Sequence, residues 1–470
     1  MKLSVRSKTV VADTITPVAA YLRLRDRLPG CLLLEGNDYQ PGKNSLSYIC
    51  VDPLKTFSVS NGQIASYYTG ERPERTEITD RTQVRTELKK FLASFEFVGE
   101  VDVPFDRGVF GYCAYDAVRY FEEIDLQQVS KPGREIPDLF YQAFRFILVF
   151  NPHKNELTVM EHQPESGLKS SYDIDSLLYL LFHADYPLYP FRRKGEQSSN
   201  FTEEGFLDVV HACKKHIKRG DVFQIVPSRR YVQPYTGDDF CVYRALRSIN
   251  PSPYLFFFDY GSFRIFGSSP EAQLVVRQDR ATLFPIAGTY KRTHNEDEDR
   301  AAIERLLEDE KENAEHVMLV DLARNDLSRH CYPVQVDSYK AVEKYSHVIH
   351  LTSRVSGELI PETNPIDILF DTFPMGTLSG APKYRAMELL DQYEHGPRRA
   401  YGGAVGMLGF DGSINHAIVI RSFHSANHEL SFQAGCGVVS DSVPESEAQE
   451  VRNKLAALQQ ALVLAEGLDQ

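Results

Sequence analysis

The chain has 470 residues, 42% of them hydrophobic, and a formal net charge of −13. This length and apolar content allow two or three domains with sizeable cores. The negative charge argues against nucleic acid as the main partner, because phosphate backbones bind basic surfaces, but a small anionic substrate needs only a local basic pocket.

Residues 1–190 alternate short β-rich runs with turns, and we interpret them as an N-terminal domain. The predicted strands are 31–34, 47–51, 140–150 and 156–161, and the predicted helix is 83–94. Two glycines among apolar residues in 106–115 are typical of closely packed strands. The polar, basic stretch 192–200 predicts a linker to the next domain.

Residues 200–470 are denser in predicted elements and form the second predicted domain. A helix is expected over 201–219, where Gly220 ends it. Apolar runs predict strands at 223–226, 255–258, 263–266, 272–276, 402–409, 417–422 and 431–439. A long helix over 445–465 is expected to bury one apolar side, formed by Leu455, Leu458, Leu462 and Leu464. Strand runs with inserted helices indicate an α+β fold instead of regular βαβ units.

The cysteine pattern and the apolar runs bear on the compartment. Seven cysteines are scattered without a Cys-x-x-Cys pair, which predicts reduced thiols and no zinc site. The N-terminal segment lacks the apolar core of a signal peptide. The longest apolar runs, such as 255–258, are too short to span a membrane. We therefore expect a cytoplasmic protein with no membrane and no nucleic acid among its partners.

Two Glu-x-x-Glu pairs are the main candidates for chemistry: Glu312 with Glu315, and Glu447 with Glu450. On a helix, residues three apart share a face, so each pair stacks two carboxylates. Taken alone, either pair is more often a solvated surface. However, Glu315 leads directly into the apolar stretch 316–322, which predicts burial. Carboxylates without a nearby His or Cys cluster suit a hard ion such as Mg²⁺.

Other motifs predict contacts with an anion. Lys454 lies one turn beyond the second pair and could bind a substrate carboxylate beside the metal. The strand end 285–289 exposes backbone N–H groups that suit a carboxylate or a phosphate, although most such turns are only turns. The segment 376–383 is similar to a phosphate-binding loop, but its spacing excludes a nucleotide site and leaves only a small anion at a helix N-terminus.

Two polar residues and one glycine-rich segment are further candidates. His350 lies within the apolar run 348–351, where a histidine is more often a satisfied core residue than an acid or base. Arg421 closes the run 418–421, and a buried arginine needs an anion, either a protein carboxylate or a substrate. The segment 433–437 offers a glycine-lined surface for close ligand approach.

Taken together, these motifs resemble those of the chorismate-utilising enzymes, and most closely the large subunits (component I) of anthranilate synthases. The matching segments are 220–229, 250–254, 267–271, 285–289, 320–326, 376–383, 401–406 and 441–447. The resemblance implies an α+β chorismate-binding fold with large antiparallel sheets in a layered sandwich flanked by helices. It also implies a catalytic domain over 200–470, and an N-terminal domain over 1–190 that carries part of a tryptophan regulatory site.

The resemblance implies catalytic and metal-binding roles for matching residues. Glu271 would protonate the departing C4 hydroxyl of chorismate, His350 would assist the later proton transfers, and Thr377 would line the ring site. The implied ligands of a Mg²⁺ cofactor are Glu315 and Glu450, with Glu312 and Glu447 nearby or acting through water.

The same resemblance implies two binding sites. The substrate-binding residues would be Gln224, Gly288, Thr289, Tyr401, Arg421, Gly435, Gly437 and Lys454. Gly288 and Thr289 would assist in holding the ring carboxylate of chorismate, and Arg421 and Lys454 would hold its enolpyruvyl carboxylate. The tryptophan-binding residues would be Glu35, Gly36, Asn250, Pro253 and Tyr254.

Two positions separate the relatives by product. Aminodeoxychorismate synthases often carry a nucleophilic lysine where this chain has Ala287, and its absence favours direct attack by ammonia, leading to anthranilate. Isochorismate and salicylate synthases carry a water-activating lysine where this chain has Gln224. Both positions favour an anthranilate synthase over aminodeoxychorismate synthase component I, the alternative. A non-catalytic chorismate or tryptophan sensor is a third possibility, against which the retained acidic residues argue.

The resemblance also implies partners. No glutaminase is recognisable in the sequence, so a separate glutamine amidotransferase subunit (component II) should supply ammonia, and this chain alone should use free ammonium. Tryptophan is the expected feedback inhibitor. Gly36 replaces a serine of the family's inhibitor motif, and Met407 and Ala417 replace a tyrosine and a cysteine of some relatives, which predicts an altered affinity for tryptophan. The chain itself contains no tryptophan, as suits an enzyme needed when tryptophan is scarce.

Overall fold

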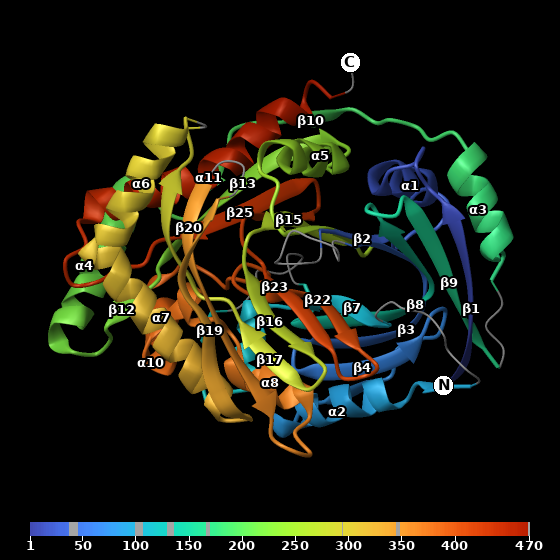
Figure 1. Cartoon of the computed structure of the whole chain (residues 1–470), viewed down its shortest axis with the longest axis horizontal. Coiled ribbons are helices and arrows are strands. Elements are labelled where there is room, and N and C mark those ends of the chain that lie inside the picture. The colour runs from blue at the N-terminus through green and yellow to red at the C-terminus, as the bar shows by residue number, and fades with distance from the viewer. Residues whose placement is uncertain are drawn as a thin grey trace.

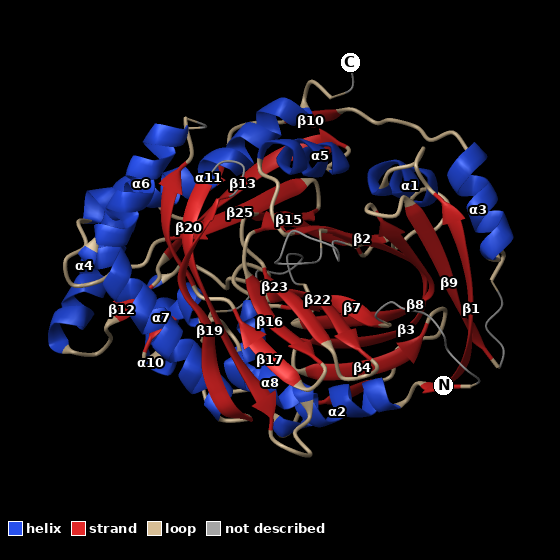
Figure 2. Cartoon of the chain, viewed as in Figure 1, coloured by secondary structure: helices blue, strands red, loops and turns tan. Residues whose placement is uncertain are grey.

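The structure is a computed structural model that describes residues 1–36, 46–98, 107–128, 136–165, 170–293, 295–344 and 348–468. The side chains at 287–291, 311, 344 and 348 are outside this description. Strands fill the middle of the molecule and helices surround them (Figures 1 and 2). The helices are α1 (Pro17–Leu24), α2 (Thr82–Ala93), α3 (Ile174–His183), α4 (Glu203–Arg219), α5 (Phe240–Ile249), α6 (Glu296–Glu308), α7 (Glu310–Ser328), α8 (Pro365–Thr372), α9 (Gly376–Ser379), α10 (Lys383–Tyr393) and α11 (Pro444–Ala465).

Apart from β12 (Gln224–Ile225) and β21 (Gly380–Ala381), which pair only with each other, the described strands form one hydrogen-bonded network with two antiparallel branches. In order of pairing, the first branch holds β1 (Lys2–Val11), β9 (Glu156–Pro164), β8 (Leu139–Asn151), β3 (Ser47–Ser60), β2 (Leu32–Glu35), β14 (Tyr254–Asp259), β15 (Phe263–Ser269), β24 (Ser422–Ala426), β25 (Glu429–Gly435) and β13 (Ser228–Gly237). The second branch leaves β8 through β7 (Gly108–Cys113), β22 (Ala404–Gly409), β23 (Ile414–Ile418), β16 (Ala272–Arg277), β17 (Arg280–Leu283) and β20 (Val348–Leu359), which also pairs with β18 (Ile286–Lys291) and β19 (Cys331–Lys344).

The two branches lie as layers, with β13, β25, β15 and β2 in the upper part of Figure 1 and β7, β22, β23 and β16 in the lower part. The predicted α+β fold with large antiparallel sheets is therefore confirmed. The predicted division near residue 190 stays a prediction. Strands from both sides of it pair directly, β2 with β14 and β7 with β22.

The structure differs most from the predicted strands and the predicted linker at two places. The predicted strand 417–422 is broken, because Arg421 has a left-handed φ of 48° between the end of β23 and the start of β24. The predicted linker 192–200 contains two short strands, β10 (Phe191–Arg193) and β11 (Ser198–Ser199), which pair with β13. In both places the backbone geometry and the pairing partner decide the structure, and local composition does not reveal either.

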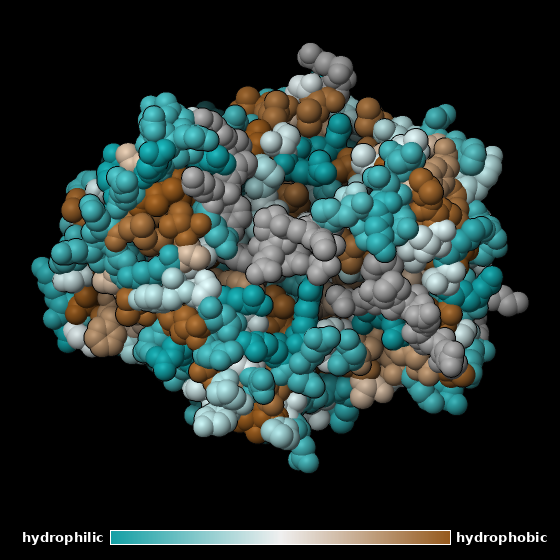
Figure 3. Space-filling view, viewed as in Figure 1, coloured by the Kyte–Doolittle hydropathy of each residue, from teal (hydrophilic) through white to brown (hydrophobic). Residues whose placement is uncertain are grey.

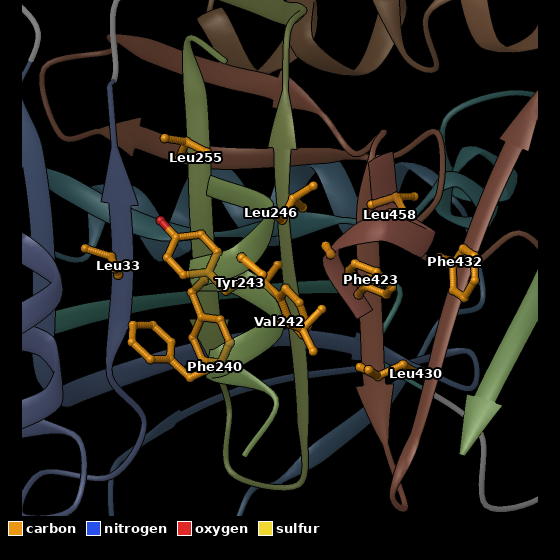
Figure 4. Close-up of a cluster of buried hydrophobic side chains, with 14 of the residues drawn as sticks. Leu33, Phe240, Val242, Tyr243, Leu246, Leu255, Phe423, Leu430, Phe432 and Leu458 are labelled. Atoms are coloured by element: carbon orange, nitrogen blue, oxygen red, sulfur yellow. The ribbon is translucent and has the colours of Figure 1, made fainter. Parts of the chain in front are cut away.

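A large apolar cluster anchors α5 and α11 to the first branch (Figure 4). Phe240, Tyr243 and Leu246 of α5 belong to it together with Phe423 of β24 and Phe432 of β25. On α11, the predicted apolar side is formed by Leu455, Leu458 and Leu462, which are at most 2% exposed. Each such leucine contributes about 1.5–3 kcal/mol by burial. Leu464 is 40% exposed, since it lies two residues past Leu462 and so faces away.

The state of the cysteines and the polarity of the surface can be compared with the predictions from composition. All seven cysteines are buried as free thiols. The face shown in Figure 3 is mostly hydrophilic, with smaller hydrophobic areas between. Within the described ranges, no helix has the length and apolar content that a membrane span requires.

Candidate active site

A cavity of about 370 Å³ lies where α7, α9 and α11 meet the ends of both strand branches. Residues from segments far apart in the sequence line it. The predicted site residues among them are Gln224, Glu271, Glu312, Glu315, His350, Thr377, Tyr401, Arg421, Gly435, Gly437, Glu450 and Lys454. The fold therefore brings most of the predicted catalytic, substrate-binding and metal-binding residues into one pocket.

Glu271 provides an acid in this cavity. It lies between β15 and β16, is 7% exposed, and accepts a hydrogen bond at 3.2 Å from the Thr377 hydroxyl to Oε1. Burial raises the pKa of the Glu271 carboxyl to about 7, against the opposing effects of the Thr377 hydrogen bond and of the positive charges of Arg421 and Lys454. A carboxyl group with this pKa is partly protonated at neutral pH and can donate a proton.

Two cations face the cavity. The left-handed backbone at Arg421 places this half-buried side chain among the lining residues, and burial lowers its pKa while Glu271 raises it. Lys454 Nζ lies 2.7 Å from Glu450 Oε1 and donates to the Gly435 carbonyl at 3.0 Å. Partial desolvation at the cavity wall lowers the pKa of Lys454, but the Glu450 carboxylate outweighs this effect and raises the lysine pKa. Both groups stay charged and can bind an anion.

Carboxylates face the cavity from two helices. Asp309 caps α7 by accepting the Glu312 N–H at 3.0 Å, so the first two turns of α7 carry Glu312 and Glu315. Glu450 reaches the cavity from α11, whereas Glu447 is 2% exposed and is buried in that helix. The predicted burial beyond Glu315 is partial: the residues at 316, 319, 320 and 323 are buried, and Val317 is 48% exposed.

The donor chemistry of these carboxylates fits Mg²⁺. In the part of the chain that the structure describes, no three His, Cys, Asp or Glu side chains gather as a preformed metal site. Mg²⁺ usually binds one or two protein carboxylates and completes its shell with water and substrate oxygens. Glu315 and Glu450 are such oxygen donors on the wall of one cavity, so they would hold the ion together with an anionic substrate.

Gln224 and Gly437 pack against Glu315. Gln224 is 2% exposed and donates from Nε2 to Glu315 Oε1 at 2.9 Å. A Cβ at Gly437 would lie 2.7 Å from Gln224 Nε2 and 3.4 Å from Glu315 Oε1. Only glycine leaves room for this hydrogen-bonded pair.

Tyr401 and His350 are two further predicted site residues in the lining. Burial raises the pKa of the Tyr401 hydroxyl to about 12, so this group remains a hydrogen-bond donor. His350 lies in β20, is 3% exposed, and pairs in register with Thr289 of β18. The side chains of Ala287 and Thr289 lie outside the described residues, and the register of β18 shifts between them, at Gly288.

Residues of the segment 376–383 make hydrogen bonds to other parts of the protein. Thr377 on α9 reaches Glu271, as described. Lys383, at the start of α10, donates to Asp326 Oδ2 and to the Thr372 carbonyl, each at 3.0 Å. The Lys383 ammonium therefore ties α10 to α7 and α8, and it is not part of the cavity lining.

The predicted inhibitor residues lie next to one another, away from the cavity lining. Glu35, at the end of β2, is 4% exposed and accepts hydrogen bonds from Tyr243 Oη at 2.7 Å and from Arg247 Nε at 2.8 Å. Gly36 has a φ of 69°, and a Cβ there would lie 3.0 Å from the Pro253 carbonyl oxygen. The glycine that replaces the family's serine therefore suits a left-handed and crowded position.

The remaining predicted inhibitor residues, Asn250 and Tyr254, flank Pro253 in the sequence. Asn250 follows α5 and accepts the Ser268 hydroxyl on its carbonyl. Tyr254 opens β14, is 2% exposed, and packs in one apolar cluster with Met407 and Ala417. The two replacements noted in the sequence thus lie in the layer that supports Tyr254, and tryptophan binding itself stays a prediction.

Several lining residues were not predicted individually, although four of them lie within the candidate segments 285–289, 376–383 and 433–437. They are Val226, Pro270, Ile286, Leu319, Leu378, Ile420, Gln433, Ala434 and Asn453. Asn453 carries a signal that could have found it, because it lies three residues beyond Glu450 on the same helical face. The apolar ones outside those segments carry none, since nothing distinguishes them from core residues in the sequence.

Comparison with known proteins agrees with these motifs. The family model described as chorismate binding enzyme matches residues 31–460. Anthranilate synthase component 1 of Thermus thermophilus is 39% identical, with 98% of each chain covered, and that of Lactococcus lactis is 37% identical, with 96% of this chain and 98% of the relative covered.

Solved structures show the same relationship. Anthranilate synthase component I from Streptococcus pneumoniae superposes with a TM-score of 0.74 at 32% identity, with 96% of this chain and 98% of that chain covered. The menaquinone-specific isochorismate synthase from Escherichia coli superposes with a TM-score of 0.72 at 17% identity, which shows a shared fold. The resemblance to the anthranilate synthase large subunits is confirmed over nearly the whole length, and the chain belongs to the chorismate-binding enzyme family.

Proposed function

We propose that this protein is the large subunit of an anthranilate synthase, a Mg²⁺-dependent lyase that converts chorismate and ammonia into anthranilate, pyruvate and water. This is the first committed step of tryptophan biosynthesis, and we expect it to take place in the cytoplasm. The observation that carries the proposal is the buried Glu271 carboxyl, with a pKa of about 7, in a cavity walled by carboxylates and cations. Near full-length similarity to anthranilate synthase components 1 supports it.

The charge distribution of the cavity fits a dianion with carboxylates at two ends. Arg421 and Lys454, with the Tyr401 hydroxyl, would bind the enolpyruvyl carboxylate by charge-assisted hydrogen bonds. The ring carboxylate would then face Glu315 and Glu450. Bound Mg²⁺ would supply the positive charge that these like-charged groups need between them.

The reaction needs an acid placed at the leaving group. Ammonia attacks the ring carbon next to the carboxylate-bearing carbon, and the C4 hydroxyl leaves as water after taking a proton from Glu271. The aminated ring carbon then loses its proton and the bond from the ring to the ether oxygen breaks, which makes the ring aromatic; the departing enolpyruvate takes up a proton and becomes pyruvate. Thr377 holds the Glu271 carboxyl at 3.2 Å in an orientation toward the cavity.

Gln224 supports ammonia as the nucleophile. Its Nε2 donates a hydrogen bond to Glu315, and its Oε1 has no hydrogen-bond partner among the described residues. A carboxamide oxygen can accept an N–H of ammonia, but it is too weak a base to activate water. Together with Ala287 in place of a lysine, this favours anthranilate over isochorismate and over 4-amino-4-deoxychorismate.

We expect this chain alone to form anthranilate from chorismate, Mg²⁺ and ammonium, and to use glutamine only with a separate amidotransferase subunit. The check is a fluorescence assay for anthranilate, with pyruvate measured in parallel and the products separated by chromatography. Equal amounts of anthranilate and pyruvate are expected. Accumulation of 4-amino-4-deoxychorismate would instead assign the protein to aminodeoxychorismate synthases, and chorismate binding without turnover would make it a sensor.

Tryptophan is expected to inhibit this reaction by lowering the apparent affinity for chorismate by about 5–150-fold, the usual range of coupling between two sites. The reason is the proximity of Glu35, Gly36 and Pro253, in positions that match the family's inhibitor site. The check is the Michaelis constant for chorismate with and without tryptophan. Unchanged kinetics at millimolar tryptophan would contradict this assignment.

A further inference from the structure

An ion pair is buried directly behind the cavity wall. The side chains of Arg398 and Glu394 are 3% and 5% exposed, and they bond through two contacts, Nη2 to Oε1 at 2.5 Å and Nε to Oε2 at 2.8 Å. Burying two charges costs so much desolvation that such a pair is weak evidence for stability by itself. Its other contacts indicate a second role.

The Arg398 guanidinium fixes two segments of the wall. Nη1 donates to the Leu378 carbonyl at 2.5 Å, and Nη2 donates to the Val226 carbonyl at 2.6 Å. Leu378 and Val226 both line the cavity, and they come from parts of the chain about 150 residues apart. One rigid, planar group therefore sets the distance between the segment that carries Thr377 and the segment that follows Gln224.

The Glu394 carboxylate extends the same network to a third segment. Its Oε1 accepts the Ser228 N–H at 2.8 Å and the Ser228 hydroxyl at 2.7 Å. The Ser228 oxygen in turn accepts Gln433 Nε2 at 2.7 Å. Gln433 lines the cavity from β25, two residues before Gly435.

Arg398 also lies against a fourth wall residue. Its guanidinium carbon is 5.7 Å from the ring centre of Tyr401 and 4.7 Å from that of Tyr115, within cation–π range. Burial raises the pKa of Tyr401, and the positive charge of Arg398 counteracts this effect. The cation thus makes the Tyr401 hydroxyl a stronger hydrogen-bond donor toward the cavity.

We propose that the buried Arg398–Glu394 pair is a positioning unit for the substrate-binding wall, which holds the segments of Val226, Leu378, Tyr401 and Gln433 in the geometry that receives the substrate's carboxylate. This inference rests on the proposed function, because it takes chorismate as the ligand. Neither residue is placed to touch the substrate, so each acts through the wall residues. Small shifts of those groups suffice to reduce binding and turnover strongly.

The experiment compares Arg398→Lys and Ser228→Ala with a matched control pair. A lysine keeps the charge at 398 but cannot make the forked contacts, and alanine at 228 removes only the hydroxyl that joins Glu394 to Gln433. The control is Arg25→Lys, which alters another largely buried pair, Arg25–Asp238, whose side chains are 9% and 13% exposed and whose residues do not line the cavity. The measurements are thermal stability, kcat and KM for chorismate, and calorimetric binding of chorismate without ammonium.

We expect Arg398→Lys to lower kcat/KM on the order of 10²-fold and Ser228→Ala to lower it by about tenfold, with weaker chorismate binding in both. Arg25→Lys should lose thermal stability with an unchanged KM. If Arg398→Lys does not fold, an unchanged kcat/KM and binding constant in Ser228→Ala overturns the proposal. A change in KM for Arg25→Lys as large as that for Arg398→Lys would also overturn the proposal. A wild-type protein that binds chorismate without forming anthranilate would refute the proposed function alone, and the calorimetric comparison would still decide the role of the pair.

Discussion

A Glu271→Gln variant is expected to lose about 10²–10⁴-fold of kcat while keeping the fold of the wild type. Glutamine has the same size and can still accept the Thr377 hydroxyl bond, which is 3.2 Å long in the wild type. It cannot donate an acidic proton to a leaving hydroxyl. The check is the rate of anthranilate formation, with circular dichroism and a thermal melt to establish folding.

The pH dependence tests the same assignment independently. Because the acid form of Glu271 is required and its pKa is raised to about 7, kcat/KM of the wild type should fall as pH rises through about 7. The Thr377 hydrogen bond lowers this pKa, so a Thr377→Val variant should move the falling limb to higher pH. A profile that rises through neutral pH would show that Glu271 acts as a base.

Helices and strands of this fold were predicted correctly where the local residue pattern determines the secondary structure. The expected helix 83–94 corresponds to α2, and the expected helix 445–465 corresponds to α11, which begins at Pro444, a residue favoured in the first turn of a helix. The run 417–422 was predicted wrongly, because its apolar residues lead directly up to Arg421, where the backbone is left-handed. Hydrophobic periodicity reports burial and does not report φ.

The site was only partly accessible from the sequence. Helical spacing shows that Glu312 and Glu315 share a face, but it does not show that α7 and α11 line one cavity, and only the family resemblance implied this. The Arg398–Glu394 pair was missed for a physical reason. The partners that Arg398 holds on the cavity wall are the backbone carbonyls of Val226 and Leu378, and no residue type in a sequence marks a carbonyl that needs a donor.

Glu315→Gln and Glu450→Gln variants are expected to lose Mg²⁺-dependent activity by at least about 10²-fold, because each change removes a charged oxygen donor from the predicted metal site. Binding of Mg²⁺ in the presence of chorismate, measured by calorimetry without ammonium, should weaken in parallel. The matched controls are Glu310→Gln on α7 and Glu445→Gln on α11, exposed positions that do not line the cavity. Near-normal turnover in either site variant would contradict the proposed metal site.

The stability of these variants separates a metal site from a structural one. Glu315 shares its cavity with Glu312 and Glu450, so replacing it by a neutral amide removes like-charge repulsion in the metal-free protein. Glu450→Gln loses the ion pair with Lys454, whose side chains are 43% and 45% exposed, and an exposed pair contributes only about 0–1 kcal/mol. Without Mg²⁺, both variants should therefore melt near or above the wild-type temperature. A large fall in melting temperature would mean that these carboxylates support the fold. Loss of activity with undiminished stability is instead expected of carboxylates whose role is to bind a cation together with an anionic substrate.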